Sequence, residues 1–216
     1  MIRIQRAGDR YPGGDPEAGI ETRHALSFGP YYDPDNLRFG PLLAVNEERL
    51  APGAGFDEHP HSHTEIVTWV VEGELTHRDT AGHETLVRPG DLQHLSSAAG
   101  VRHVERNAGD TPLTFVQMWL APLEPGGDPA YTLTRDLPGA YAVPAAGATL
   151  RVHRPAEGEE VPLPDADTLY VHVVRGAVAL ADRELRAGDA ARITAEKALR
   201  ATATEAAELL VWEFRG

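Results

Sequence analysis

The sequence lacks cysteine, carries a single lysine at Lys197, and has no long apolar run. Without cysteine the chain cannot form disulfides, thiolate metal sites or cysteine nucleophiles. Its apolar runs are far shorter than the ~20 residues that a membrane-spanning helix needs. The first residues carry charges with no apolar stretch behind them, which is unlike a secretory signal. These absences predict a cytoplasmic protein that makes no membrane contact.

Positive charge is also scarce. Lysine and arginine total 20 residues against 33 aspartates and glutamates, which gives a formal net charge of -13. The basic residues are scattered and form no cluster, so a surface of this sign should repel phosphate backbones. We therefore expect no direct binding to nucleic acid. The hydrophobic fraction of 42% is enough for a globular core, and we expect a monomer.

Glycine and proline are plentiful, at 21 and 17 residues, and they divide the chain into pieces too short for many helices. Between them lie runs rich in β-branched and aromatic residues, which predict strands. A helical pattern is found only at residues 193–199. Many short strands separated by regular turns predict an all-β sandwich or barrel. The expected strands cover residues 42–45, 66–71, 75–78, 115–120, 169–174, 177–180 and 209–214.

Two stretches of the chain share one pattern: a strand, a glycine turn, a second strand and a Gly-Asp turn. The first stretch spans residues 70–91 and the second spans residues 173–189. Such internal similarity predicts a duplicated barrel. A Pro- and Gly-rich stretch separates the two copies. We therefore expect an N-terminal domain at residues 1–122, a linker at residues 123–137 and a C-terminal domain at residues 138–216.

Histidine gathers in one part of the chain, where seven of the ten histidines lie between positions 59 and 103. His59 and His61 occupy alternate positions, so both side chains point to the same face of a strand. Two imidazoles from one strand can then reach a single ion at ~2.0–2.1 Å. Pro60 cannot donate to a sheet ladder, which predicts a strand start or a sheet edge here. His103 and Glu105 share a face in the same way and could complete a site for one divalent transition metal.

The spacing of these residues resembles the two sequence motifs of the cupin superfamily. Two positions depart from the pattern: seven residues rather than six separate Glu65 from Gly73, and Ala98 replaces the usual proline. The matching positions are Gly53, His59, His61, Glu65 and Gly73 in the first motif, and Gly100, His103 and Asn107 in the second.

A wider set of segments resembles the pirin family within that superfamily. The resemblance implies an all-β bicupin, with two cupin (jelly-roll-type) β-barrels in tandem. The second barrel offers only His153 and His172 and no His-x-His pair, so we expect a degenerate cupin domain without metal. The segments that carry the resemblance are residues 23–34, 59–61, 65–73, 77–79, 88–93 and 100–105.

The resemblance implies a ligand set, because the metal ligands of pirins fall on His59, His61, His103 and Glu105. The general cupin pattern instead favours Glu65 as the acidic ligand. The carboxylate that does not bind the ion could instead hydrogen-bond to a metal ligand and orient it. Iron is the expected ion, with manganese, cobalt, nickel, copper and zinc as alternatives, because geometry and supply decide among them.

The resemblance also implies a function. Pirin-like proteins include quercetin 2,3-dioxygenases, so we expect a small aromatic substrate of the flavonol type together with dioxygen. Glu105 would be catalytic, accepting the proton of a flavonol hydroxyl whose pKa the metal lowers. The alternative is a metal- or redox-sensing regulatory protein that acts through a protein partner without catalysis. A cavity beside the metal large enough for a flavonol would favour the enzyme, and a closed site would favour the sensor.

Other conspicuous side chains have simpler interpretations. His77 and His83 flank a turn and are expected in solvent, whereas His94 is expected to pack or to line the pocket. His24 is expected to make a structural contact. Large aromatic side chains usually fill barrels, so the tryptophans are expected in the core. They are Trp69, Trp119 and Trp212.

Overall fold

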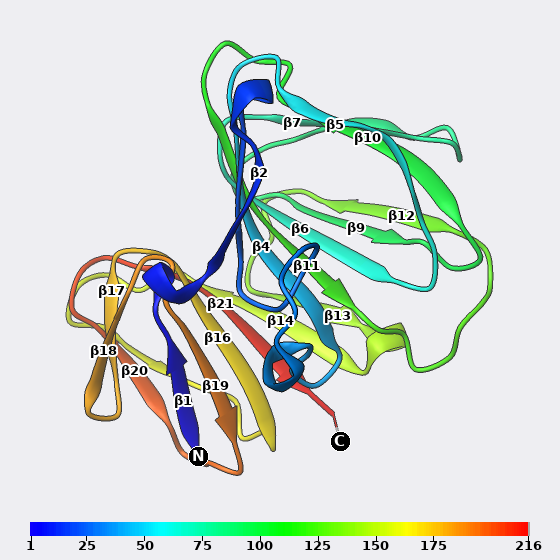
Figure 1. Cartoon of the computed structure of the whole chain (residues 1–216). Coiled ribbons are helices and arrows are strands. Elements are labelled where there is room, and N and C mark those ends of the chain that lie inside the picture. The colour runs from blue at the N-terminus through cyan, green and yellow to red at the C-terminus, as the bar shows by residue number, and fades with distance from the viewer. Residues whose placement is uncertain (216) are drawn as a thin grey trace. The chain divides into compact units, whose positions relative to one another are not determined.

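The computed structural model describes residues 1–215, and most of them lie in strands (Figure 1). They divide into two compact units, neither of which is contiguous in sequence. The N-terminal unit comprises Tyr11–Arg38 and Leu42–Leu137. The C-terminal unit comprises Met1–Arg10, Phe39–Pro41 and the described residues from Pro138 onward. Each unit is built from antiparallel sheets, and the prediction of an all-β bicupin is confirmed.

The helical content is limited to single 3-10 turns. None of the helices in the described part of the chain has the length and apolar character needed to cross a membrane. The 3-10 helices are η1 (Ala7–Asp9), η2 (Pro16–Ala18), η3 (Pro34–Asn36) and η4 (Pro144–Ala146).

The N-terminal unit contains strands β2 to β12. Their bounds are β2 Tyr11–Asp15, β3 Ile20–His24, β4 Leu42–Leu50, β5 Gly55–His61, β6 Glu65–Glu72, β7 Leu75–Asp79, β8 Glu84–Val87, β9 Leu92–Ser96, β10 Val101–Arg106, β11 Leu113–Leu120 and β12 Ala130–Thr134. A seven-stranded sheet has the order β12-β9-β6-β11-β4-β3-β2, and a four-stranded sheet has the order β5-β10-β7-β8. Strand β5 is therefore an edge strand, as the proline at position 60 predicts.

The C-terminal unit contains strand β1 and strands β13 to β21. Their bounds are β1 Ile2–Gln5, β13 Ala140–Val143, β14 Ala148–His153, β15 Glu160–Pro162, β16 Thr168–Arg175, β17 Ala177–Leu180, β18 Arg183–Arg186, β19 Ala190–Thr194, β20 Arg200–Ala203 and β21 Glu208–Phe214. A six-stranded sheet has the order β1-β19-β16-β21-β14-β13, and a four-stranded sheet has the order β15-β20-β17-β18.

The two units repeat one turn in detail, which supports the predicted duplication. The Asp91 carboxylate accepts from the backbone N–H of Arg88 at 3.0 Å, and the Asp189 carboxylate accepts from that of Arg186 at 3.1 Å. In both turns the aspartate N–H donates back to the arginine carbonyl at 2.9 Å. The glycine before each aspartate has a φ of 93° or 84°, a conformation that other residues rarely adopt.

The expected domain boundaries differ from the compact units in three places, of which the shortest is Phe39–Pro41 in the C-terminal unit. Strand β1 belongs to the C-terminal unit, where it pairs with β19. Strand β12 lies inside the expected linker of residues 123–137 and pairs with β9 in the N-terminal unit. Both pairings join segments that are distant in sequence, so composition alone does not reveal them.

The helix expected at residues 193–199 is wrong. Strand β19 continues through Ile193 to Thr194, and it pairs with β1 along one edge and with β16 along the other. The chain then turns through Ala195 and Ala198, whose φ values are 55° and 54°. These left-handed conformations are incompatible with a right-handed helix, so sheet pairing overrides the local pattern.

Each unit has its own apolar core. Phe115 and Leu113 belong to a buried cluster in the N-terminal unit, and Val171 belongs to one in the C-terminal unit. Trp69 and Trp212 are fully buried, as expected. Burial of a large apolar side chain contributes ~1.5–3 kcal/mol, so these clusters stabilise the two sheets of each unit.

Candidate metal centre

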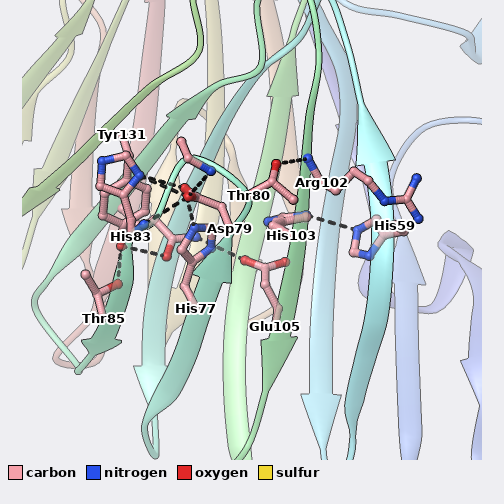
Figure 2. A network of polar contacts seen from close by, with 12 residues as sticks. His59, His77, Asp79, Thr80, His83, Thr85, Arg102, His103, Glu105 and Tyr131 are labelled. Atoms are coloured by element: carbon pink, nitrogen blue, oxygen red, sulfur yellow. Dashed lines mark hydrogen bonds and ion pairs between the residues drawn. The ribbon is translucent and has the colours of Figure 1, made fainter.

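Two paired strands bring three histidines together in the N-terminal unit. Strand β10 pairs with β5 so that His103 lies directly opposite His59. The Nε2 atoms of these two rings are 3.0 Å apart (Figure 2). The His61 ring centroid lies 4.8 Å from each of the other two ring centroids. One nitrogen from each histidine lies within 4.8 Å of the others, so the three can hold a single metal ion.

Local contacts prepare these imidazoles to act as ligands. The Nδ1–H of His59 donates to the carbonyl oxygen of Asp57 at 2.7 Å, which leaves a lone pair on Nε2. The Nε2 of His61 is buried and has no hydrogen-bond partner among the described residues. Burial, followed by the neighbouring His103 and His59, lowers the pKa of His61 to about 4. His61 is therefore neutral at pH 7 and presents an unused lone pair.

Glu105 supplies a carboxylate next to these rings. The pairing of β10 with β5 shifts register between His103 and Glu105, and the Glu105 side chain is fully enclosed. Its oxygens accept hydrogen bonds from the amides of Gln93 at 3.0 Å and Gln117 at 2.8 Å. Burial alone would raise the pKa of Glu105, but the nearby His103 and His77 and the two amides outweigh it and lower the pKa. The carboxylate is therefore ionised.

His77 lies in the candidate site, and the sequence analysis placed it wrongly. It is expected in solvent, but its exposed fraction is 0%. On β7 it lies directly opposite Glu105, and one donor atom from each of His77, His103 and Glu105 lies within 4.8 Å of the others. The alternation of His77 and Asp79 on one face was the available signal, but the register of β7 against β10 was needed to interpret it.

A polar network holds His77 from behind (Figure 2). Its Nε2–H donates to Asp79 at 3.2 Å, and the half-buried His83 donates to the same carboxylate at 2.9 Å. Burial would raise the pKa of Asp79, but hydrogen bonds from the backbone N–H of His83 and from the side chains of His77 and His83 outweigh it and lower the pKa. Tyr131 stacks on both imidazoles, with centroid distances of 4.6 and 4.9 Å, and its hydroxyl contacts Gln93. The network therefore supports both His77 and the amide that binds Glu105.

Glu65 lies apart from this cluster. The carboxylate accepts from His94 at 2.7 Å and from Ser96 at 2.8 Å, which engages both of its oxygens. Among the described residues it is not part of either group that could hold an ion. His94 therefore makes a specific hydrogen bond to Glu65, whereas a packing or pocket-lining role was expected for it.

A cavity of about 400 Å³ opens beside the histidine cluster. Its wall includes Trp119, which is half-buried rather than in the core, and Glu48, a buried acid that the sequence analysis did not single out. His24 makes the expected structural contact, a hydrogen bond with Asn46 at 2.9 Å, and it also faces the cavity. The lining residues are Gly13, Gly14, Thr22, His24, Phe28, Gly29, Pro30, Asn46, Glu48, Phe56, His59, Glu105, Gln117 and Trp119.

Two jelly-roll barrels, with histidines gathered on paired strands of one of them, define the chain as a bicupin. A family model described as Pirin matches residues 6–120, and a second, described as Quercetinase C-terminal cupin domain, matches residues 148–214. The chain belongs to the pirin family, which confirms the resemblance drawn from its motifs.

Known relatives match nearly the whole chain. A protein of Mycobacterium tuberculosis with the provisional name quercetin 2,3-dioxygenase is 38% identical over 233 residues, covering 99% of this chain and 95% of the relative. The quercetin 2,3-dioxygenase of Escherichia coli is 30% identical over 230 residues, covering 99% of both. The crystal structure of the E. coli pirin YhhW in complex with nickel(II) matches with a TM-score of 0.91 at 27% identity, covering 99% of both chains.

Proposed function

We propose that the protein is a metal-dependent dioxygenase that cleaves flavonols of the quercetin type. The observation that carries this proposal is the cluster of His59, His61 and His103, with the buried Glu105 grouped with the shared His103, beside a cavity of about 400 Å³. That volume lies within the usual range of small-molecule sites. The quercetin 2,3-dioxygenase names of relatives support the substrate class and the use of dioxygen.

The residues present fit a divalent transition metal held by His59, His61, His103 and Glu105. Two nitrogen ligands ~2.1 Å from one ion and at right angles to each other would be about 3.0 Å apart. The Nε2 atoms of His59 and His103 have this separation. The unpartnered Nε2 of His61 is a second sign of fit, because buried polar atoms normally have partners.

Among the two candidate carboxylates, we propose Glu105 as the acidic ligand because it groups with His103 and His77, whereas Glu65 belongs to neither group of described residues that could hold an ion. Iron is the proposed ion, and manganese, cobalt, nickel, copper and zinc are alternatives with suitable ligand preferences. The nickel(II) complex of the E. coli pirin supports a divalent ion in this fold.

When bound, the ion would act as a Lewis acid that lowers the pKa of the flavonol hydroxyl. Glu105 is proposed as the catalytic base, accepting the hydroxyl proton on a carboxylate oxygen while Gln93 and Gln117 hold the group in place. Overall, both oxygen atoms of dioxygen enter the product, two carbon–carbon bonds of the central ring break, and one carbon leaves as carbon monoxide. Aromatic side chains in the cavity wall would exclude water from the substrate.

The open cavity also favours an enzyme over the metal- or redox-sensing alternative. A sensor that acts through a protein partner needs no space beside the ion, whereas a flavonol does. The cavity wall includes His59 and Glu105 themselves, so a bound molecule can reach the candidate centre.

The test is a turnover assay with iron-loaded protein, quercetin and dioxygen. We expect loss of the flavonol absorbance, uptake of one dioxygen per quercetin, and release of carbon monoxide. His59→Ala should abolish all three, and His63→Ala, which alters an exposed histidine just after strand β5, is the matched control. Turnover by His59→Ala at the wild-type rate would contradict the proposal.

A further inference from the structure

Four polar side chains form a continuous ladder on the cavity wall. Thr22 and His24 lie on β3, and they pair directly with Glu48 and Asn46 on β4. The Thr22 hydroxyl donates to Glu48 at 2.5 Å, and the His24 Nδ1–H bonds to the Asn46 amide oxygen at 2.9 Å. All four are buried in the protein and line the cavity. Neither the cupin motifs nor the candidate metal centre uses any of them.

The hydrogen bonds within the ladder determine whether His24 and Glu48 can donate or accept a hydrogen bond in the cavity. The Asn46 oxygen accepts from His24, so the His24 Nε2 carries a lone pair and is an acceptor. The Asn46 side chain also hydrogen-bonds to Glu48, which links the two rungs. Burial, with a smaller contribution from Glu105, raises the pKa of Glu48 to about 8, although the bonds from Thr22 and Asn46 oppose the shift. At neutral pH Glu48 is therefore mostly a neutral acid with a proton to donate.

The ladder lines the same cavity as His59 and Glu105, and three aromatic rings line it as well. Strand β2 passes over His24 at Gly13, where any larger residue would collide with the His24 Nε2. The glycine keeps this ring within the cavity wall. The aromatic side walls are Phe28, Phe56 and Trp119.

We propose that the ladder is a recognition subsite for phenolic hydroxyl groups on the pendant ring of the substrate. Glu48 donates a hydrogen bond to one such hydroxyl, and His24 accepts one through Nε2. The aromatic side walls contact the flat faces of the rings between the two ends. The inference rests on the proposed function and narrows the substrate class to flavonols with a hydroxylated pendant ring.

The experiment measures equilibrium binding of three flavonols to metal-loaded protein without dioxygen, by quenching of tryptophan fluorescence. Quercetin carries two hydroxyls on the pendant ring, kaempferol carries one, and galangin carries none. Wild-type protein should bind quercetin about tenfold more tightly than galangin, with kaempferol between them. In Glu48→Leu the ratio should fall to about one, because the loss of the donor affects only the hydroxylated ligands.

Two further variants separate recognition from structural damage. Glu48→Gln keeps a neutral donor and should retain most of the discrimination, whereas His24→Phe keeps a ring against Phe28 but removes the acceptor and should lose it. If Glu48→Leu does not fold, His24→Phe carries the test. Glu21→Leu changes an exposed acid on β3 and is the matched control. Metal content and melting temperature are measured for every variant.

The outcomes distinguish this inference from the proposed reaction. Discrimination that survives in both Glu48→Leu and His24→Phe, or that is lost equally in Glu48→Gln and Glu48→Leu, would overturn the subsite. Discrimination that depends on Glu48 in a protein that consumes no dioxygen would support the subsite and overturn the dioxygenase proposal. If wild-type protein binds none of the three flavonols, both proposals fail.

Discussion

His77 lies directly opposite Glu105 across the pairing of β7 with β10, and both side chains are buried. The pair joins the candidate metal centre to the carboxylate of Asp79, which binds His77 on its other side. Support for the centre therefore extends one strand beyond the residues proposed to bind the ion. Such supporting contacts orient ligands and set their basicity.

Replacement of Asp79 should weaken metal binding although Asp79 is not a proposed ligand. Asp79→Asn removes the charge that holds both His77 and His83. We expect the metal dissociation constant to rise by about 10–100-fold, measured by competition with a chelator. Asp110→Asn, at an exposed position of the same unit, is the control. An unchanged affinity in Asp79→Asn would show that the network does not support the centre.

Replacement of each candidate carboxylate should have a different effect on how far metal raises the melting temperature. An ion that binds only the folded state at 100 times its dissociation constant adds about 2.7 kcal/mol to stability. Glu105→Gln should lose most of the resulting rise in melting temperature. Glu65→Gln should retain it, because Glu65 belongs to neither group of described residues that could hold an ion. The reverse pattern would assign the acidic ligand to Glu65.

Glu48 predicts a pH-dependent stability. Its pKa is about 8 in the folded protein, raised from 4.5 mainly by burial, so the folded state holds a proton that the unfolded state releases earlier. The stability contributed by Glu48 is therefore fully present below pH 4.5 and is lost as pH rises through 8. Relative to Glu48→Gln, wild-type stability should fall between these values in urea titrations of metal-free protein. A constant difference between the two proteins would contradict the raised pKa.

Replacement of Asp189 in the repeated Gly-Asp turn should lower the stability of the protein without changing its metal binding. Asp189 accepts from the N–H groups of Ala7 and Arg186 at 2.8 and 3.1 Å and pairs with Arg6 at 2.7 Å. Asp189→Ala should lower the free energy of unfolding by ~1–3 kcal/mol because buried donors lose their acceptor. Urea unfolding measures this, with Asp182→Ala at an exposed position as the control.

Asp189 should also make the free energy of unfolding sensitive to acid. Burial would raise the pKa of Asp189, but hydrogen bonds from Ala7, Arg186 and Arg6 outweigh it and lower the pKa below its usual value of 3.8. Its contribution is therefore present above the unfolded-state pKa and is lost as pH falls through the folded-state pKa. Wild type and Asp189→Ala should converge in stability as acid is added, and metal affinity should be equal in both.

Much of the fold and part of the site could be predicted because they depend on local patterns. Alternation on a single strand places His59 and His61 on one face, and Pro60 marks the sheet edge. The glycine turns reveal the duplication. The pirin motifs add His103 and Glu105 from a second strand.

The remaining parts depend on which strands pair and in what register. His77 enters the site only because β7 lies beside β10, and Glu48 faces the cavity only because β4 pairs with β3. Neither strand pairing can be predicted from the sequence alone. Trp119 was expected in the core because size suggests burial, but its position beside His61 leaves it on the cavity wall.

The pairing of β1 with β19 determines when the C-terminal barrel can form during synthesis. The residues of β1 are translated well before those of its partner β19. Until β19 is made, the nascent Ile2–Gln5 lacks the strand with which it pairs, so the C-terminal barrel closes only after β19 has been translated. A fragment beginning at Pro138 would expose the edge of β19 and invite aggregation, whereas a circular permutant that carries residues 1–10 after position 215 would keep that edge covered.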